Sequence, residues 1–203
     1  MLKGCDISHF NYPFPWERLS PDFKFVYAKA TQGATYRDPY FNEYWQHLKT
    51  TPLLRGAYMF WDCRYTAQEH WDNIASLGID FSKPNVLPLC LDLENQMTAE
   101  LDKFVIHNQA KCVASIKELL GMIAQHTGRK AMIYTYANYT KEYLAGATFP
   151  DCYLWLADYD GTAPVQKWDL WQASEHGTLS GALTGGQLDI DLFNGTIEEL
   201  ASL

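Results

Sequence analysis

Residues 88–95 read Pro-Leu-Cys-Leu-Asp-Leu-Glu-Asn, an apolar run that ends in two carboxylates. We interpret residues 86–94 as a buried strand, and side chains alternate across a strand, so Asp92 and Glu94 point the same way. At ~3.3 Å per residue their backbones lie roughly 6.6 Å apart. Burial and mutual repulsion are expected to raise the pKa of one carboxyl group, which makes it a candidate general acid. An edge-strand surface pair or two loop caps would show the same spacing.

Short apolar runs alternate with helix-like segments on both sides of this stretch. Sequence periodicity predicts strands at residues 2–8, 24–31, 54–61, 86–94, 130–136, 153–157, 168–173 and 188–193. It predicts helices at 41–49, 67–77 and 101–125, at most a short helical turn at 139–144, and a closing helix at 196–203. Thr66 and Glu69 form a predicted capping box before the second helix.

Strands that are separated by helices imply right-handed parallel crossovers, and eight such strands indicate a closed barrel. We therefore predict an α/β fold, an irregular TIM-like barrel of eight mostly parallel strands with about five helices. No linker, internal repeat or low-complexity segment interrupts the chain, so residues 1–203 are expected to form a single catalytic barrel domain.

The composition excludes several classes of partner. The net charge is −8, whereas nucleic acids and anionic membranes bind clustered Lys and Arg. No apolar run approaches the ~20 residues of a membrane span, and Asp6 interrupts the first residues before any signal-peptide core. The five cysteines form no Cys-x-x-Cys pair and no cluster with histidine. We therefore expect free thiols, synthesis in a reducing cytoplasm, no metal and no cofactor.

Acidic and aromatic side chains gather at the predicted carboxyl ends of the strands, where barrels of this class carry their active sites. The acids are Asp6 after the first strand, Asp92 and Glu94 after the fourth, and Asp189 in the last. Carboxylates work on glycosidic bonds, and flat aromatic surfaces suit sugar rings. The aromatic candidates for substrate binding are Tyr58, Phe60, Trp61, Tyr134, Trp155, Tyr159 and Trp171. Core packing is the competing interpretation for several of these rings.

Eight short motifs, taken in order, resemble the glycoside hydrolase family 25 muramidases, the Chalaropsis-type lysozymes. They lie at residues 6–8, 25–33, 56–58, 91–94, 133–135, 154–157, 171–172 and 188–189, and together they span about residues 4–195. The resemblance implies an eight-stranded barrel that hydrolyses the β-1,4 bond between N-acetylmuramic acid and N-acetylglucosamine. It makes peptidoglycan glycan strands the expected partner.

The resemblance also implies roles for single residues. Glu94 matches the general acid of the family, and Asp92, Asp6 and Asp189 match its aspartates. Asp191 stands where the family usually has asparagine, so we leave it outside the catalytic set.

One position departs from the family pattern in the motif of the second strand. Gln32 stands where the family usually has a glutamate, which removes a charge near the cleft.

Two chemical routes remain open at this stage. The N-acetyl group of the substrate could attack the anomeric carbon while Asp92 orients its N–H and stabilises the intermediate. Alternatively, a water could attack from the other face, with Asp6 or Asp189 as its base.

Two other functions also remain open, a catalytically silent carbohydrate-binding barrel and a chitinase-like hydrolase. We expect a monomer that reaches the cell wall through a lysis pore or a dedicated secretion machine.

Overall fold

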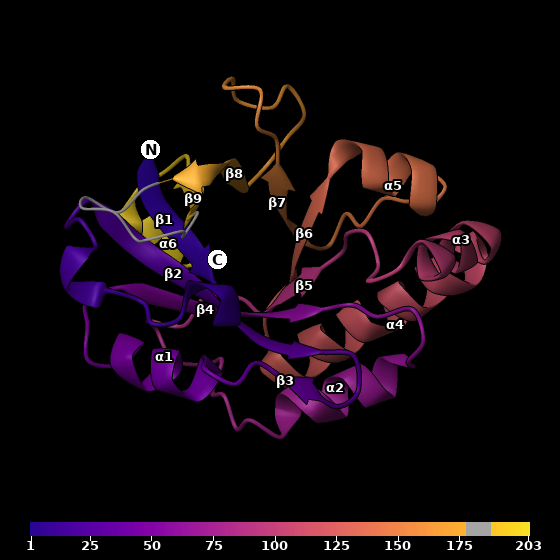
Figure 1. The fold of residues 1–203 in the computed structure, drawn as a ribbon, viewed down its shortest axis with the longest axis horizontal. Helices are drawn as coiled ribbons and strands as arrows, with labels where there is room; N and C mark the ends of the chain where they lie inside the picture. The colour runs from indigo at the N-terminus through magenta and orange to yellow at the C-terminus, as the bar shows by residue number, and fades with distance from the viewer. Residues whose placement is uncertain (178–187) are drawn as a thin grey trace.

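The computed structural model describes residues 1–177 and 188–203 and shows a closed β-barrel with helices packed against its outside (Figure 1). The barrel strands are β1 (Leu2–Ile7), β2 (Phe23–Gln32), β4 (Leu54–Phe60), β5 (Cys90–Asp92), β6 (Met132–Tyr136), β7 (Tyr153–Ala157), β8 (Leu170–Gly177) and β9 (Leu188–Phe193). A short strand, β3 (Tyr36–Arg37), pairs antiparallel with the end of β2.

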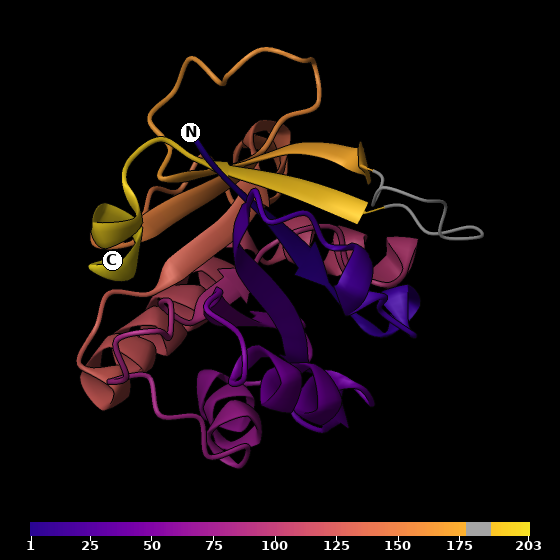
Figure 2. The same ribbon diagram turned by 90° about the vertical axis from the view of Figure 1, so that its left-hand side faces the viewer.

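The strands close into a ring in the order β1-β2-β4-β5-β6-β7-β8-β9. Every neighbouring pair from β1 to β8 is parallel, whereas β9 runs antiparallel to both β8 and β1. Figure 2 shows β9, in yellow, lying beside β8. The prediction of an irregular TIM-like barrel with eight mostly parallel strands is confirmed.

The described residues form six α-helices. They are α1 (Phe41–Leu48), α2 (Ala67–Ala75), α3 (Ala99–His107), α4 (Gln109–Thr127), α5 (Ala137–Tyr143) and α6 (Ile197–Ala201), with 3-10 turns η1 (His9–Asn11) and η2 (Trp16–Arg18). The predicted capping box is present at α2, where Thr66 accepts the backbone N–H of Glu69 and Glu69 accepts that of Thr66. Helix α4 ends at Gly128, whose φ of 68° lies in the left-handed region that glycine adopts at low cost.

Three predicted elements differ from the structure. The expected helix at 101–125 is two helices, because Asn108 leaves helical geometry (φ −124°, ψ 27°) and its side-chain N–H donates to the Phe104 carbonyl. The expected helical turn at 139–144 is the seven-residue helix α5. Strand β5 has only three residues instead of the expected nine, since Pro88 lacks an N–H for the ladder and Val86 makes only an isolated bridge to Arg55.

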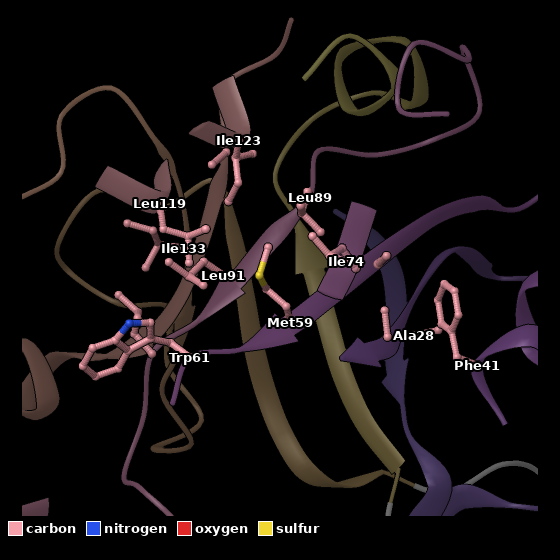
Figure 3. Close-up of a cluster of buried hydrophobic side chains, with 14 of the residues drawn as sticks. Ala28, Phe41, Met59, Trp61, Ile74, Leu89, Leu91, Leu119, Ile123 and Ile133 are labelled. Carbon is pink, nitrogen blue, oxygen red and sulfur yellow. The ribbon is translucent and has the colours of Figure 1, made fainter. Parts of the chain in front are cut away.

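Alternation along the strands divides the buried apolar residues into two clusters. The outer cluster fills the space between strands and helices, and Figure 3 shows Leu91 and Ile133 of neighbouring strands close to Leu119 and Ile123 of α4. The inner cluster fills the barrel itself, and its members are Phe25, Tyr27, Leu54, Leu87, Cys90, Met132, Trp155, Leu170, Phe193 and Leu200.

Contacts between strands that are not neighbours locate the inner cluster. The Tyr27 hydroxyl on β2 donates to the Pro88 carbonyl at 3.0 Å and lies 3.5 Å from the sulfur of Met132 on β6. The strands β4 and β5 separate β2 from β6 in the ring, so this contact crosses the interior of the barrel. The floor of the barrel is therefore a packed core, and any cavity must lie above it.

Candidate active site

The strand positions that follow the inner cluster carry polar side chains. Lys29 comes two residues after Tyr27, and Asp92 comes two residues after Cys90, so each points into the barrel above its apolar neighbour. These positions open into a cavity of about 260 Å³. Its lining residues are Asp6, Ser8, Phe10, Lys29, Tyr58, Asp92, Glu94, Tyr134, Trp155, Tyr159, Gln172, Glu175 and Asp189.

All four predicted catalytic acids line this cavity, together with Glu175 and a single described cation, Lys29. Burial raises the pKa of Asp92 well above its ordinary value, and the neighbouring charge of Glu94 raises it further. Burial likewise raises the pKa of Glu94. The ammonium group of Lys29 opposes both of these pKa shifts, as expected for an interior cation beside acids.

Asp92 lies deeper than Glu94. The Asp92 residue is only 5% exposed, and its Oδ1 is buried and accepts no hydrogen bond from the described part of the chain. Glu94 is half-buried and faces the same cavity. A buried carboxylate oxygen without a donor is costly, so Asp92 is poised to accept a hydrogen bond from a bound molecule.

Asp6 on β1 and Asp189 on the neighbouring strand β9 form a second acidic pair. Burial raises the pKa of Asp6, and the charge of Asp189 adds to that increase. The pKa of Asp189 rises to about 6, first through burial and then through the charge of Glu175. The side-chain interaction between the two carboxyl groups raises the pKa of Asp6 further and opposes the increase in the pKa of Asp189.

A hydrogen-bond network holds Asp6 from the other side. The side-chain N–H of Gln172 donates to Asp6 Oδ2 at 2.7 Å. The side-chain oxygen of Gln172 accepts a hydrogen bond of 2.7 Å from the Tyr134 hydroxyl, and a second one from the Tyr159 hydroxyl. Since both tyrosines occupy the Gln172 oxygen, its N–H group is turned toward Asp6, where it favours the ionised carboxylate.

Asp191 lies outside the cavity lining, one level below Asp6. It is fully buried, and Trp155 donates its indole N–H to Asp191 Oδ1 at 3.0 Å. Burial raises the pKa of Asp191, and the charges of Asp6 and Asp189 raise it further. The residue that we left out of the catalytic set therefore supports an aromatic wall of the cavity.

Paired acids at the mouth of a barrel are an arrangement with which glycoside hydrolases work. The model of the glycosyl hydrolases family 25 matches residues 5–182 of the chain. The chain belongs to this family. It is therefore a glycoside hydrolase, as the motif resemblance predicted.

Alignments with similar proteins cover almost the whole of this family 25 enzyme. The uncharacterized protein YegX of Escherichia coli strain K12 is 32% identical over 208 residues, which cover 98% of this chain and 72% of YegX. Lysozyme M1 of Streptomyces globisporus is 28% identical over 217 residues, covering 100% of this chain and 71% of that lysozyme. The solved structure of a family GH25 lysozyme from Aspergillus fumigatus has a TM-score of 0.85 and 28% identity, over 99% of this chain and 97% of that one.

Four of the seven aromatic residues predicted for substrate binding line the cavity of the family 25 enzyme, and three do not. Those that line it are Tyr58, Tyr134, Trp155 and Tyr159. Phe60 points inward, but its ring lies against Lys29, whose Nζ is 5.1 Å from the ring centroid.

The structure places Trp61 and Trp171 on the outside of the barrel. Each follows or precedes an inward-facing residue, and neighbours on a strand point to opposite faces. Trp61 is fully buried in the outer cluster (Figure 3), and Trp171 donates its indole N–H to the Asp158 carbonyl at 2.7 Å. These two tryptophans therefore stabilise the fold and do not face the substrate.

Five residues that line the family 25 site were not among the predicted site residues, namely Ser8, Phe10, Lys29, Gln172 and Glu175. Strand alternation was a usable signal for Gln172, which comes two residues after the inward-facing Leu170. Gln32, which replaces the usual family glutamate, donates to the Met97 sulfur and does not line the cavity.

The described residues contain no group of three or more His, Cys, Asp and Glu side chains arranged to hold a metal ion. None of the helices in the described ranges is long and apolar enough to cross a bilayer.

Proposed function

We propose that this family 25 hydrolase cleaves the β-1,4 bond between N-acetylmuramic acid and N-acetylglucosamine in the glycan strands of bacterial peptidoglycan. The observation that carries the proposal is the acidic cavity, in which Asp6, Asp92 and Glu94 at the carboxyl ends of β1 and β5 converge with Asp189 at the amino end of the antiparallel strand β9. Lysozyme M1 among the relatives supports the choice of glycan.

Glu94 is the proposed general acid. Burial raises its pKa, so it can hold a proton at the pH of catalysis, and it is the more accessible member of the Asp92–Glu94 pair. The proton of Glu94 passes to the bridging glycosidic oxygen as the bond to the anomeric carbon breaks. Lys29 lies near enough to Glu94 to stabilise the carboxylate that remains.

Asp92 is the proposed partner of the substrate's N-acetyl group. Its buried Oδ1 accepts no hydrogen bond from the described residues, and an amide N–H of the substrate would satisfy it. That hydrogen bond would orient the acetamido oxygen toward the anomeric carbon. It would also favour the ionised form of Asp92, which would stabilise the positive charge that develops on the acetamido nitrogen. This favours the substrate-assisted route, which retains the anomeric configuration.

Asp6 and Asp189 are the candidates for the competing route, in which one of them activates a water. The Gln172 N–H favours the ionised form of Asp6, whereas burial and the charge of Asp189 raise the pKa of Asp6. In the substrate-assisted route an ionised carboxylate of this pair would stabilise the oxocarbenium-like transition state.

The decisive experiment is mass analysis of the products after digestion of purified peptidoglycan, with the Glu94→Gln variant as the inactive control. Reducing ends on muramic acid are expected. Reducing ends on glucosamine, cleavage of chitin in preference to peptidoglycan, or binding without cleavage would each contradict the proposal. The last two outcomes correspond to a chitinase-like hydrolase and a silent carbohydrate-binding barrel.

Proton NMR of the first product formed separates the two routes. An initial β anomer is expected from substrate assistance, whereas an initial α anomer would assign the chemistry to a water activated by Asp6 or Asp189.

We further propose that the enzyme acts on the cell wall as a monomer after synthesis in a reducing compartment. None of the five cysteines, all of which lie in the described ranges, is in a disulfide, which supports that compartment. Release through a lysis pore or a dedicated secretion machine stays a prediction.

A further inference from the structure

A row of three aromatic rings leads outward from the catalytic cavity. Phe10 lines the cavity and is 84% exposed. The ring of His9 lies 4.0 Å from that of Phe10, centroid to centroid, and the ring of Tyr36, itself 40% exposed, lies 6.2 Å from His9. We propose that these three rings, here called the aromatic shelf, bind a sugar ring of the glycan strand outside the catalytic cavity.

The backbone beneath the shelf is fixed before any ligand binds. The turn η1 carries a capping box in which Ser8 Oγ accepts the Phe10 N–H and the Ser8 N–H donates to Asn11 Oδ1 at 2.8 Å. Asp38, a buried acid, accepts the backbone N–H of His9 at 2.9 Å through Oδ2. A rigid turn that presents a ring to solvent loses little conformational entropy on binding.

The orientation of His9 is fixed by the same acid. Its Nδ1 lies 2.9 Å from Asp38 Oδ2, and the Tyr36 hydroxyl lies 3.3 Å from the same nitrogen. A buried carboxylate is costly unless it is paired, and here it is paired with the middle ring of the shelf. Since Tyr36 belongs to β3 and His9 follows β1, the contact joins two segments into one surface.

The size of the cavity requires a further binding surface. A cavity of about 260 Å³ is smaller than the ~300–1,000 Å³ sites that hold a single drug-sized ligand. A glycan strand of several rings must therefore extend past its rim, and the shelf begins at the rim with Phe10.

The chemistry of the shelf favours an uncharged sugar ring as the occupant. The apolar face of a sugar can lie against an aromatic ring, as other apolar groups do. Glu175 and Asp189 at the same rim would repel a polyanion. The inference rests on the proposed function, because a glycan strand is the ligand in both.

The test uses the full chain with Phe10→Ala, Tyr36→Ala and the double variant. Steady-state kinetics on long glycan strands are compared with those on a tetrasaccharide of the same repeat. Removal of each ring is expected to raise KM for long strands roughly 3- to 10-fold, as for the loss of an aromatic contact, while kcat stays within about twofold. The tetrasaccharide should show a smaller change, because fewer of its rings extend past the cavity.

Two further variants sharpen the test. Phe10→Trp keeps a large flat ring and should restore the KM for long strands. Phe104→Ala is the matched control, since Phe104 is 39% exposed on α3 and does not line the cavity. It should leave the KM for long strands unchanged, and thermal unfolding should show that every variant is folded.

Binding of long strands is measured separately in a Glu94→Gln background, where no cleavage is needed. Weaker binding by the Phe10→Ala and Tyr36→Ala variants supports the shelf, even if wild-type enzyme cleaves a different bond from the one proposed. Unchanged binding and unchanged KM in the double variant would refute the shelf and leave the proposed function intact. Failure of the parent Glu94→Gln protein to bind any glycan would refute both.

Discussion

The interior of the barrel has two levels that are built on the same strands and differ completely in chemistry. On β2 the lower level carries Tyr27 and the upper level Lys29, and on β5 they carry Cys90 and Asp92. The lower level is a packed and largely apolar floor, which also holds the buried carboxyl group of Asp191. The upper level holds five carboxyl groups around one lysine among the described lining residues.

The difference shows that one strand can serve both stability and function. Which of the two a residue serves depends on how far along the strand it lies. The floor gains stability from apolar burial, whereas the mouth carries acids whose raised pKa values record the cost of burying charge. Apolar burial in the floor therefore offsets the free-energy cost of the buried acids in a marginally stable domain.

The largest effect is expected from a substitution in the upper level only. Glu94→Gln removes the proposed proton donor without changing the shape of the side chain, so turnover should fall by roughly 10²–10⁴. Thermal stability should stay the same or rise, because a carboxyl group with an unfavourably raised pKa is removed. Release of reducing ends and a melting curve check the two parts, and unchanged turnover would remove Glu94 from its role.

The second prediction concerns a substitution in the lower level. Met132→Ala leaves a void in the inner cluster, where Met132 is fully buried, and should cost about 2–5 kcal/mol of unfolding free energy. The folded fraction should keep its kcat, because Met132 does not line the cavity. Chemical denaturation measures the loss. A fall in kcat as large as that of Glu94→Gln would mean that the two levels are not separable.

Gln172 tests whether the upper level works as a connected network. Gln172→Leu removes the N–H that Asp6 accepts and the oxygen that Tyr134 and Tyr159 share. Turnover should fall roughly 10-fold, consistent with the loss of a hydrogen bond to a charged group. The pKa of Asp6 should rise further, so the pH profile should shift upward. A loss of turnover with an unmoved pH profile would indicate a purely structural role.

The smallest expected effect is a change in the pH dependence of stability. The pKa of Asp189 is about 6 in the folded chain against an ordinary value of 3.8. Between these two pH values Asp189 keeps its proton in the folded state but loses it in the unfolded state. The stability that this proton contributes is therefore fully present below roughly pH 4 and is lost as the pH rises through about 6.

The Asp189→Asn variant lacks this dependence. Its melting temperature should gain on that of the wild type between roughly pH 4 and 7, and the two proteins should converge at lower pH. Melting curves across this range measure the difference. Parallel curves for the two proteins would show that the pKa of Asp189 is not raised in the folded state.

Much of the fold and part of the site were predictable because they depend on local pattern. The order of strands and helices follows from periodicity, and the placing of Asp6, Asp92 and Glu94 follows from the rule that carboxyl ends of barrel strands meet. Asp189 instead reaches the cavity from the amino end of β9, because that strand runs antiparallel to its neighbours. Alternation was also local, and applying it strictly would have separated Trp61 from its neighbour Phe60.

The sequence by itself therefore determined the order of the strands and helices and the strand positions of most acids, because each depends on residues close together in the chain. The antiparallel direction of β9 was decided only by the tertiary structure. Only the tertiary structure decided which side chains meet in the cavity, such as Asp6 with Asp189 and with its hydrogen-bond donor Gln172. It also brought Phe10, His9 and Tyr36 into one row beside the cavity. Apart from the neighbours His9 and Phe10, those contacts join segments that are distant in sequence, and their geometry is set by how the segments pack together rather than by any local preference.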